Sequence, residues 1–461
     1  MVVMSRAIYS GASLAQVRSD LKGLVEFEHE GMDSTDLSSQ LETTLVPHLL
    51  NYGSPEFQSM FNAFPEEGAL IGAELALHVN QGVTNWQVSP GGAVLEELCC
   101  EKLCELFELS EKSEATFMYS GTYGNQQALY LALHRHAEKM GFDYSREGMS
   151  GFVNPKNLKI VVAEDVHFSV LHAARFLGLG ENALLKIGLD ENLRINPAEV
   201  MKVLEGHASE HEIVCVVVTL GSTITGSVDG LPGISKMCSE KGVWLHADGA
   251  YGLAYSLLPE KEHLFRGLEM VDSIVWDPHK QLGIPIPSSL LFLNDGTNFE
   301  RVNVYSNYFN RKEEEMPNPG LKSPPSTRPF SALPLVTSIK TQGLHGLRKR
   351  LRSSINAVND LAEFLIDDAE IEIMNEPDTG VICFRVQPVE IDKQDLCSLQ
   401  EYVYTRTNLE GKRAISIATI KGKKVLRLVS VSPEVTVRAL KSTILSIKEM
   451  AKKFVKNLES Y

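Results

Sequence analysis

The chain contains several apolar runs of strand length, and each of them ends abruptly at polar residues. Residues 213–220 form a continuous apolar run, which is typical of a parallel strand covered on both faces. Residues 243–248 and 274–276 have the character of two further buried strands, and the β-branched run 159–164 that of another. Runs of this kind predict an α/β fold with a mostly parallel sheet.

The ends of two of these runs carry residues that suit one another chemically. Asp248 closes the run at 243–248, and Lys280 follows the run at 274–276, two residues after Pro278, which fixes φ and stops the strand. Lys280 therefore lies on a loop at a strand end, where α/β enzymes place their reactive groups, although a surface lysine is the commoner interpretation of such a residue taken alone. Pyridoxal phosphate needs an amine to form a Schiff base and a carboxylate that keeps its pyridine nitrogen protonated.

The sequence Asp-Pro-His-Lys at 277–280, after His-Ala-Asp-Gly-Ala-Tyr at 246–251, resembles the group II pyridoxal-phosphate-dependent amino-acid decarboxylases. Members of that family act on glutamate, tyrosine, aspartate, histidine and aromatic amino acids. The resemblance implies fold type I, in which a mostly parallel sheet between helices is followed by a smaller α+β domain. We therefore expect an N-terminal arm at 1–52, a large cofactor-binding domain at 53–342 and a small domain at 343–461.

Residues 117–125 combine a strand end, a turn of small residues and the start of a helix. Free N–H groups and the positive end of the helix dipole make such a turn an anion site. We expect the cofactor phosphate there, held by Gly121, Thr122 and the N–H group of Tyr123. The family often has Gly-Gly-Thr-Glu-Gly-Asn at this point, whereas Ser120 replaces the first glycine here and Tyr123 the glutamate.

The resemblance assigns four further residues to the cofactor. His167 would stack over the pyridine ring, although single histidines are usually structural or exposed. Thr219 would lie near the ring or its 3-oxygen, Ala250 beneath the ring, and His279 near the phosphate.

The substrate side of the predicted site rests on weaker patterns. Phe61 and Asn62 fall where relatives line the substrate pocket, but an ordinary loop with buried aromatic residues explains them equally well. Arg427 could hold the substrate carboxylate through a bidentate pair, or it could be an arginine at the rim of the site. No metal ligands are expected.

Residues 301–328 form a polar, proline-rich interval of the kind that often covers an active site. Relatives use a tyrosine on such a loop to return a proton to the substrate α-carbon, which makes Tyr305 and Tyr308 candidates. Surface tyrosines are an equally good interpretation of both. Residues 326–328 resemble a segment that closes the site in relatives.

Charge and cysteine content limit the alternatives. The net charge of −15 argues against a nucleic-acid partner, and seven cysteines without framework spacing fit reduced thiols in the cytoplasm. Cys99, Cys100 and Cys104 fall within a predicted helix at 93–109, where they are expected to pack in the core. The longest apolar run is too short to span a bilayer, and residues 1–14 do not resemble a secretory signal, so no membrane association is expected.

Taken together, the motifs predict a cytoplasmic homodimer that decarboxylates an L-amino acid to the corresponding amine and carbon dioxide, with pyridoxal phosphate as a Schiff base on Lys280. A pyridoxal-phosphate carbon–carbon lyase, similar to the sphingosine-phosphate lyases, shares much of the pattern. A non-catalytic paralogue that keeps the fold is the remaining alternative.

Overall fold

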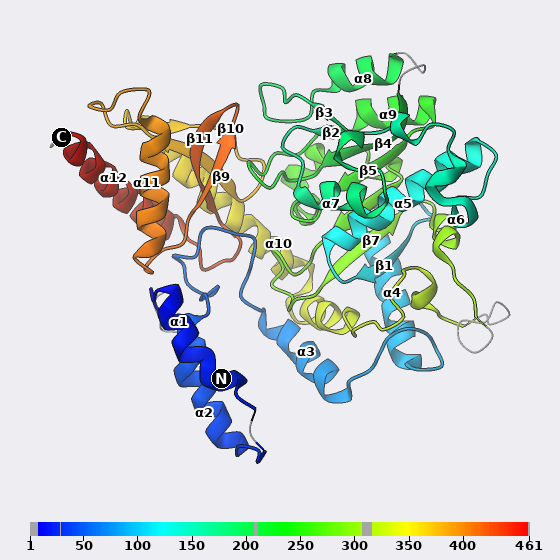
Figure 1. Cartoon of the computed structure of the whole chain (residues 1–461), viewed down its shortest axis with the longest axis horizontal. Helices are drawn as coiled ribbons and strands as arrows, with labels where there is room; N and C mark the ends of the chain where they lie inside the picture. Colours follow the sequence, from blue (N-terminus) through cyan, green and yellow to red (C-terminus); the bar gives the residue numbers. More distant parts are fainter. Residues whose placement is uncertain (1–7, 28, 207–210, 307–315, 460–461) are drawn as a thin grey trace. The chain divides into compact units, whose positions relative to one another are not determined.

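A computed structural model describes residues 8–27, 29–206, 211–306 and 316–459 of the chain (Figure 1). The chain forms two compact units, Pro65–Arg352 and a second unit that combines Met1–Phe64 with Ser353–Tyr461. The expected division at residues 52 and 342 stays a prediction.

The larger unit is built on a seven-stranded sheet with the order β1-β7-β6-β5-β4-β2-β3. Neighbouring strands are parallel from β6 through to β3, and β7 runs antiparallel to both β6 and β1. The predicted α/β class with a mostly parallel sheet is confirmed. The strands are β1 (Glu114–Met118), β2 (Leu158–Ala163), β3 (Leu184–Ile187), β4 (Glu212–Thr219), β5 (Trp244–Asp248), β6 (Ser273–Trp276) and β7 (Ser289–Leu293).

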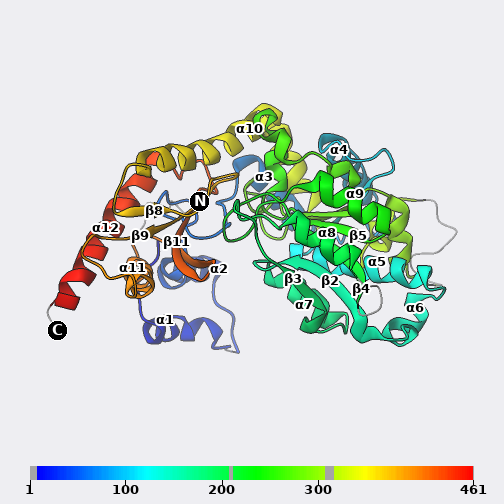
Figure 2. The ribbon, with the colours of Figure 1, turned by 90° about the horizontal axis from the view of Figure 1, so that it is seen from above.

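Helices cover both faces of this sheet. The helices α5 and α7 pack together on one face, and α8 and α9 lie on the other, as Figure 2 shows for α7, α8 and α9. The sheet is therefore apolar on both sides. In β4, for example, the valines at 214, 216, 217 and 218 are all buried. The helices of this unit include α3 (Glu67–Val79), α4 (Pro90–Leu106), α5 (Gly121–Lys139), α6 (Tyr144–Glu147), α7 (Phe168–Phe176), α8 (Pro197–Glu205) and α9 (Leu231–Lys241).

One expectation about a helix is confirmed in this part of the chain. The helix predicted at 93–109 is α4, in which Cys99, Cys100 and Cys104 are buried. A longer helix, α10 (Ala332–Leu365), is interrupted at Gly343, which has a φ of 61°. No helix in the described part of the chain is long and apolar enough to cross a bilayer.

The smaller unit has an antiparallel sheet with the order β10-β11-β9-β8. Leucines and isoleucines at helical spacing on α10 and α12, among them Leu361 and Ile444, are buried in its core. The helices α1 and α2 near the N-terminus contribute no buried residue. The elements are α1 (Leu14–Leu21), α2 (Ser34–Thr44), β8 (Ile371–Ile373), β9 (Val381–Val386), α11 (Leu396–Leu409), β10 (Ser416–Ile420), β11 (Lys423–Val429) and α12 (Val437–Glu459).

Candidate active site

The ends of three adjacent parallel strands bring the central site residues together. Thr219 at the end of β4 is paired in register with Asp248 at the end of β5, and Asp248 is paired with Val275 of β6. β6 ends one residue later, and a turn closed by a 3.0 Å hydrogen bond from the Lys280 N–H to the Asp277 carbonyl follows. Because parallel strands end at the same edge, Thr219, Asp248 and Lys280 all lie at the carboxyl edge of the sheet.

Asp248 is a buried carboxylate with two hydrogen-bond donors, and its residue is only 6% exposed. The Asn125 side-chain amide donates to Oδ2 at 2.9 Å, and the Ala250 N–H donates to Oδ1 at 3.2 Å. The two donors reach different oxygens of the carboxylate and so hold it in one orientation.

Lys280 lies beside the turn that was predicted to bind phosphate. Its Nζ is 3.3 Å from Oδ2 of Asp277, whose other oxygen accepts a hydrogen bond from the Ser289 hydroxyl. A Cβ atom added to Gly121 would lie 2.8 Å from the same Oδ2. The loop that carries Lys280 and the N-terminus of α5 are thus in direct contact, and the close approach requires glycine at position 121.

The first turn of α5 has the geometry of an anion site. Ser120 is the extended N-cap residue, and its hydroxyl accepts a hydrogen bond from the Tyr123 N–H at 3.4 Å. The N–H groups of Gly121 and Thr122 have no acceptor within the helix because they lie in its first turn. A Cβ atom on Gly124 would lie 2.6 Å from Cγ2 of Val275, so α5 sits close against β6.

His167 begins α7 and belongs to the same cluster. Its Nδ1 lies 2.8 Å from the Ser169 hydroxyl and accepts from the Ser169 N–H at 3.3 Å. Burial lowers the pKa of His167, the charge of Asp248 opposes that shift, and the charge of Lys280 reinforces it. Both charged groups therefore act on the imidazole.

His279 is held by the backbone of Ser288, the residue before β7. Its Nδ1 lies 2.6 Å from the Ser288 carbonyl, and its Nε2 lies 3.8 Å from Oδ2 of Asp277. Burial lowers the pKa of this imidazole as well. Asp277 thus lies between His279 and Lys280 and contacts both.

The remaining predicted residues are two loop tyrosines and three residues of the smaller unit. Tyr305 is exposed, with its hydroxyl 3.0 Å from the Asn303 side-chain amide group, and Tyr308 lies outside the described residues. Phe61, Asn62 and Arg427 belong to the smaller unit, where the Arg427 guanidinium lies 5.1 Å from the centre of the Phe61 ring.

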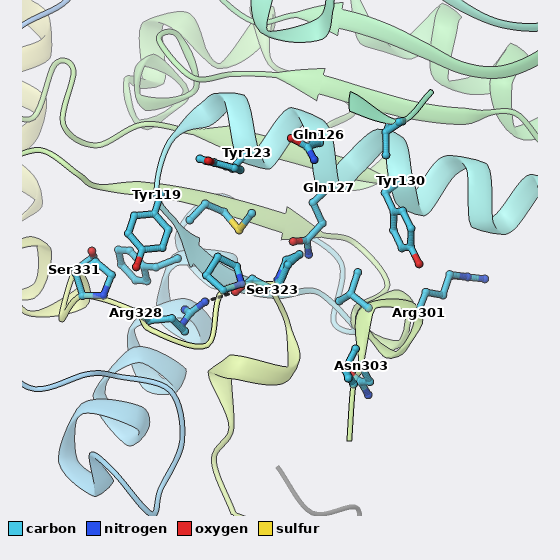
Figure 3. Close-up of a pocket in the computed structure, with 18 of the residues that line it drawn as sticks. Tyr119, Tyr123, Gln126, Gln127, Tyr130, Arg301, Asn303, Ser323, Arg328 and Ser331 are labelled. Carbon is cyan, nitrogen blue, oxygen red and sulfur yellow. Dashed lines mark hydrogen bonds between the residues drawn. The ribbon is translucent and has the colours of Figure 1, made fainter. Parts of the chain in front are cut away.

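A cavity of about 460 Å³ lies beside α5 and the end of β1 (Figure 3). Tyr123, Gln126, Gln127 and Tyr130 line it from α5, and Phe117 and Met118 line it from β1. The Tyr123 side chain therefore points into the cavity, and only its backbone belongs to the turn at the start of α5.

The guanidinium of Arg328 makes buried hydrogen bonds within the larger unit. Its guanidinium donates to the carboxylate of Glu96, to the Ser323 hydroxyl and, at 3.1 Å, to the carbonyl of Val83. The segment that resembles a site-closing element is thus anchored to α4 by a buried ion pair.

Sequence reasoning missed the polar residues behind Asp248. Asn125 and His246 are both buried. They lie within the motifs at 117–125 and 246–251, but the sequence predicted no function for either side chain. Strand periodicity could have identified His246, because a residue two positions before Asp248 shares its face of the strand. The contact of Asn125 with both residues depends on how α5 lies over β5.

A lysine, a buried carboxylate and a helix N-terminus at the edge of a mostly parallel sheet define the pyridoxal-phosphate class of α/β enzymes. The sequence profile described as the pyridoxal-dependent decarboxylase conserved domain matches residues 21–387. The chain belongs to this family and is a pyridoxal-phosphate-dependent amino-acid decarboxylase.

Characterised relatives match over almost the whole chain. L-2,4-diaminobutyrate decarboxylase of Acinetobacter baumannii is 24% identical over 456 residues, which cover 96% of this chain and 89% of the relative. Aromatic-L-amino-acid decarboxylase of Bacillus atrophaeus is 24% identical, with 91% of this chain and 86% of the relative covered. The solved structure of Oryza sativa TDC with PLP and tryptamine has the same fold, with a TM-score of 0.89, 20% identity, and coverage of 98% of this chain and 94% of that one.

Proposed function

We propose that the chain converts a free L-amino acid to its amine and carbon dioxide, with Lys280 as the residue that carries pyridoxal phosphate. The observation that carries this proposal is the placement of Lys280 and Asp248 at the ends of adjacent strands, next to the N-terminus of α5. Only glycine at position 121 leaves room for the contact with Asp277. The residues present therefore fit the cofactor.

When bound, pyridoxal phosphate supplies a protonated pyridine ring that accepts the electrons released as the substrate carboxylate leaves. Asp248 would keep the proton on the pyridine nitrogen, and the first-turn N–H groups of α5, at Gly121 and Thr122, would hold the phosphate. His167 and Ala250 would contact the ring. Lys280 would hold the cofactor through its Nζ atom until the substrate amine takes its place.

Other contributions are proposed on the resemblance. Thr219 lies beside Asp248 in the sheet and would contact the ring or its 3-oxygen, and His279 would reach the phosphate. Tyr305 or Tyr308 would return the proton to the substrate α-carbon. The substrate contacts would come from Phe61, Asn62 and Arg427, with the guanidinium paired to the substrate carboxylate.

The assembly and the substrate complete the proposal. We expect a cytoplasmic homodimer with its sites near the subunit interface. L-2,4-diaminobutyrate and aromatic amino acids are the first substrates to test, because named relatives act on them.

The test is a screen of amino acids for carbon dioxide and amine formation, with the wild-type chain and the Lys280→Ala variant. We expect wild type to release both products from one or a few amino acids, and Lys280→Ala to release neither. Lys236→Ala, which removes an exposed lysine from α9, is the control and should match wild type. Full turnover by Lys280→Ala, or an aldehyde product without carbon dioxide, would refute the proposal.

A further inference from the structure

We propose that Asn125 and His246 are positioning residues that fix Asp248 as an ionised, correctly oriented partner for the pyridine nitrogen. Neither residue would touch the cofactor or the substrate. This inference rests on the role proposed above for Asp248 and goes beyond it, because it explains what holds Asp248 in that role.

The two residues lie in one continuous chain of buried hydrogen bonds. The Asn125 amide lies 2.9 Å from Asp248 and 2.8 Å from the Ser169 hydroxyl, and its Oδ1 lies 2.8 Å from Nε2 of His246. Nδ1 of His246 lies 2.8 Å from the Ser273 hydroxyl, which also accepts from the indole N–H of Trp244 at 2.8 Å. Elements α5, α7, β5 and β6 all contribute to this chain.

The direction of these hydrogen bonds follows from the Asp248 end. The Asn125 amide nitrogen donates to the Asp248 carboxylate, so Oδ1 of Asn125 accepts from Nε2 of His246, which carries the ring hydrogen. Nδ1 of the neutral ring then accepts from the Ser273 hydroxyl, whose oxygen accepts from the indole N–H of Trp244. Turning the Asn125 amide around would place its oxygen against the Asp248 carboxylate, which the structure avoids.

A neutral imidazole is required for this direction, since a protonated ring would donate from both nitrogens. His246 is completely buried, and burial lowers its pKa to about 4, against the opposing charge of Asp248. This series of hydrogen bonds is therefore intact at neutral pH, and it directs only hydrogen-bond donors toward Asp248.

The same amide also sets the state of His167. Asn125 Nδ2 has two hydrogens, one for Asp248 and one for Ser169. The Ser169 hydroxyl can then donate to Nδ1 of His167, which leaves the ring hydrogen of the neutral imidazole on Nε2. One asparagine thus orients the carboxylate and fixes the tautomer of the histidine.

The test is the variant Asn125→Asp, which keeps the shape of the side chain but places a second carboxyl group against Asp248. The groups whose charges act on this cluster are His246 on β5, His167 and His172 on α7 and, beyond β6, Lys280 and Asp277. We expect the variant still to gain visible absorption on reconstitution with pyridoxal phosphate. In a plot of kcat against pH, the acid limb should move to higher pH by about 1 unit. The pH at which the visible absorption band of the bound cofactor changes should move by the same amount. kcat should fall roughly tenfold with KM almost unchanged.

A pair of variants at position 246 gives an independent test. His246→Gln keeps an N–H donor near the place of Nε2, whereas His246→Leu removes it. We expect His246→Gln to retain more of kcat and a pH profile closer to wild type than His246→Leu. Equal losses in the two variants would overturn the proposal, because a purely structural role would not depend on the donor.

The matched control is Asn294→Asp. Asn294 also donates to buried groups, the carbonyls of Leu268 and Val271, but it follows the end of β7 that is remote from Ser289 and Asp277. Its pH profile should equal that of wild type. An Asn125→Asp variant with wild-type kcat and pH profiles would overturn the inference, whereas a wild-type chain that takes up no cofactor would instead refute the proposed function. Should Asn125→Asp not fold, the comparison at position 246 decides the question.

Discussion

The buried ion pair between Arg328 and Glu96 allows a quantitative prediction about the segment that resembles a site-closing element. The two side chains are only 4% and 2% exposed. Arg328 also donates to Thr116 at 3.2 Å and to Val83 at 3.1 Å, and Glu96 accepts in addition from the Phe117 N–H at 3.3 Å. Removing the guanidinium leaves a buried charge with little compensation, so Arg328→Met should lower the free energy of unfolding by about 3–5 kcal/mol.

The cost of Arg328→Met should depend on pH. Burial raises the pKa of Glu96 above its ordinary value of 4.5, and Arg328 opposes that shift. Without Arg328 the folded-state pKa rises further, and between the unfolded and folded values the folded state binds more protons than the unfolded one. Stability is then lost as pH rises through this window, so the cost should be larger at about pH 8 than at about pH 5.

The assay is urea unfolding of both proteins, followed by circular dichroism at the two pH values. The double variant Glu96→Leu with Arg328→Met is the control, and it should be more stable than Arg328→Met alone because no unpaired charge remains. A stability of Arg328→Met equal to wild type, or a cost that grows on acidification, would refute the reasoning.

Three further predictions concern the site and its support. Asp248→Asn should keep the fold and lower kcat by about 100-fold, measured as carbon dioxide release, because the ring nitrogen loses its charged partner; near-wild-type rates would contradict this. Gly124→Ala should cost about 1–3 kcal/mol in urea unfolding because its Cβ would lie 2.6 Å from Val275, whereas Gly233→Ala in α9, with open space around it, should cost nothing. The free energy of unfolding should fall as pH drops from 6.5 toward 4, since the buried His246 takes up its proton only in the unfolded state, and His246→Gln should flatten that dependence.

The sequence was sufficient for β2, β4, β5 and β6 because each of these parallel strands is a buried apolar run that ends at a polar residue. It did not predict the parallel strand β3, which is short and has an exposed lysine at its third position. The direction of β7 could not be predicted in the same way. Its run Ser289–Leu293 is buried in either direction, and the choice depends on the connection from β6, which has no crossover helix.

The candidate active site, too, could be predicted only in part from the sequence. Lys280 and Asp248 could be singled out because the chemistry of one cofactor connects a lysine with an acid. The contacts of Asn125 with His246 and of Arg328 with Glu96 join residues 121 and 232 positions apart. Such contacts depend on how the helices lie over the sheet, and no local sequence pattern predicts them.

The central claim is that Lys280 carries the cofactor, and chemical trapping tests it most directly. The protein would be reconstituted with pyridoxal phosphate, reduced with borohydride, digested, and mapped by mass spectrometry. Our account predicts a single modified peptide, with the pyridoxyl group on Lys280. Modification of a different lysine, or no stable modification in a protein that binds the cofactor, would contradict it.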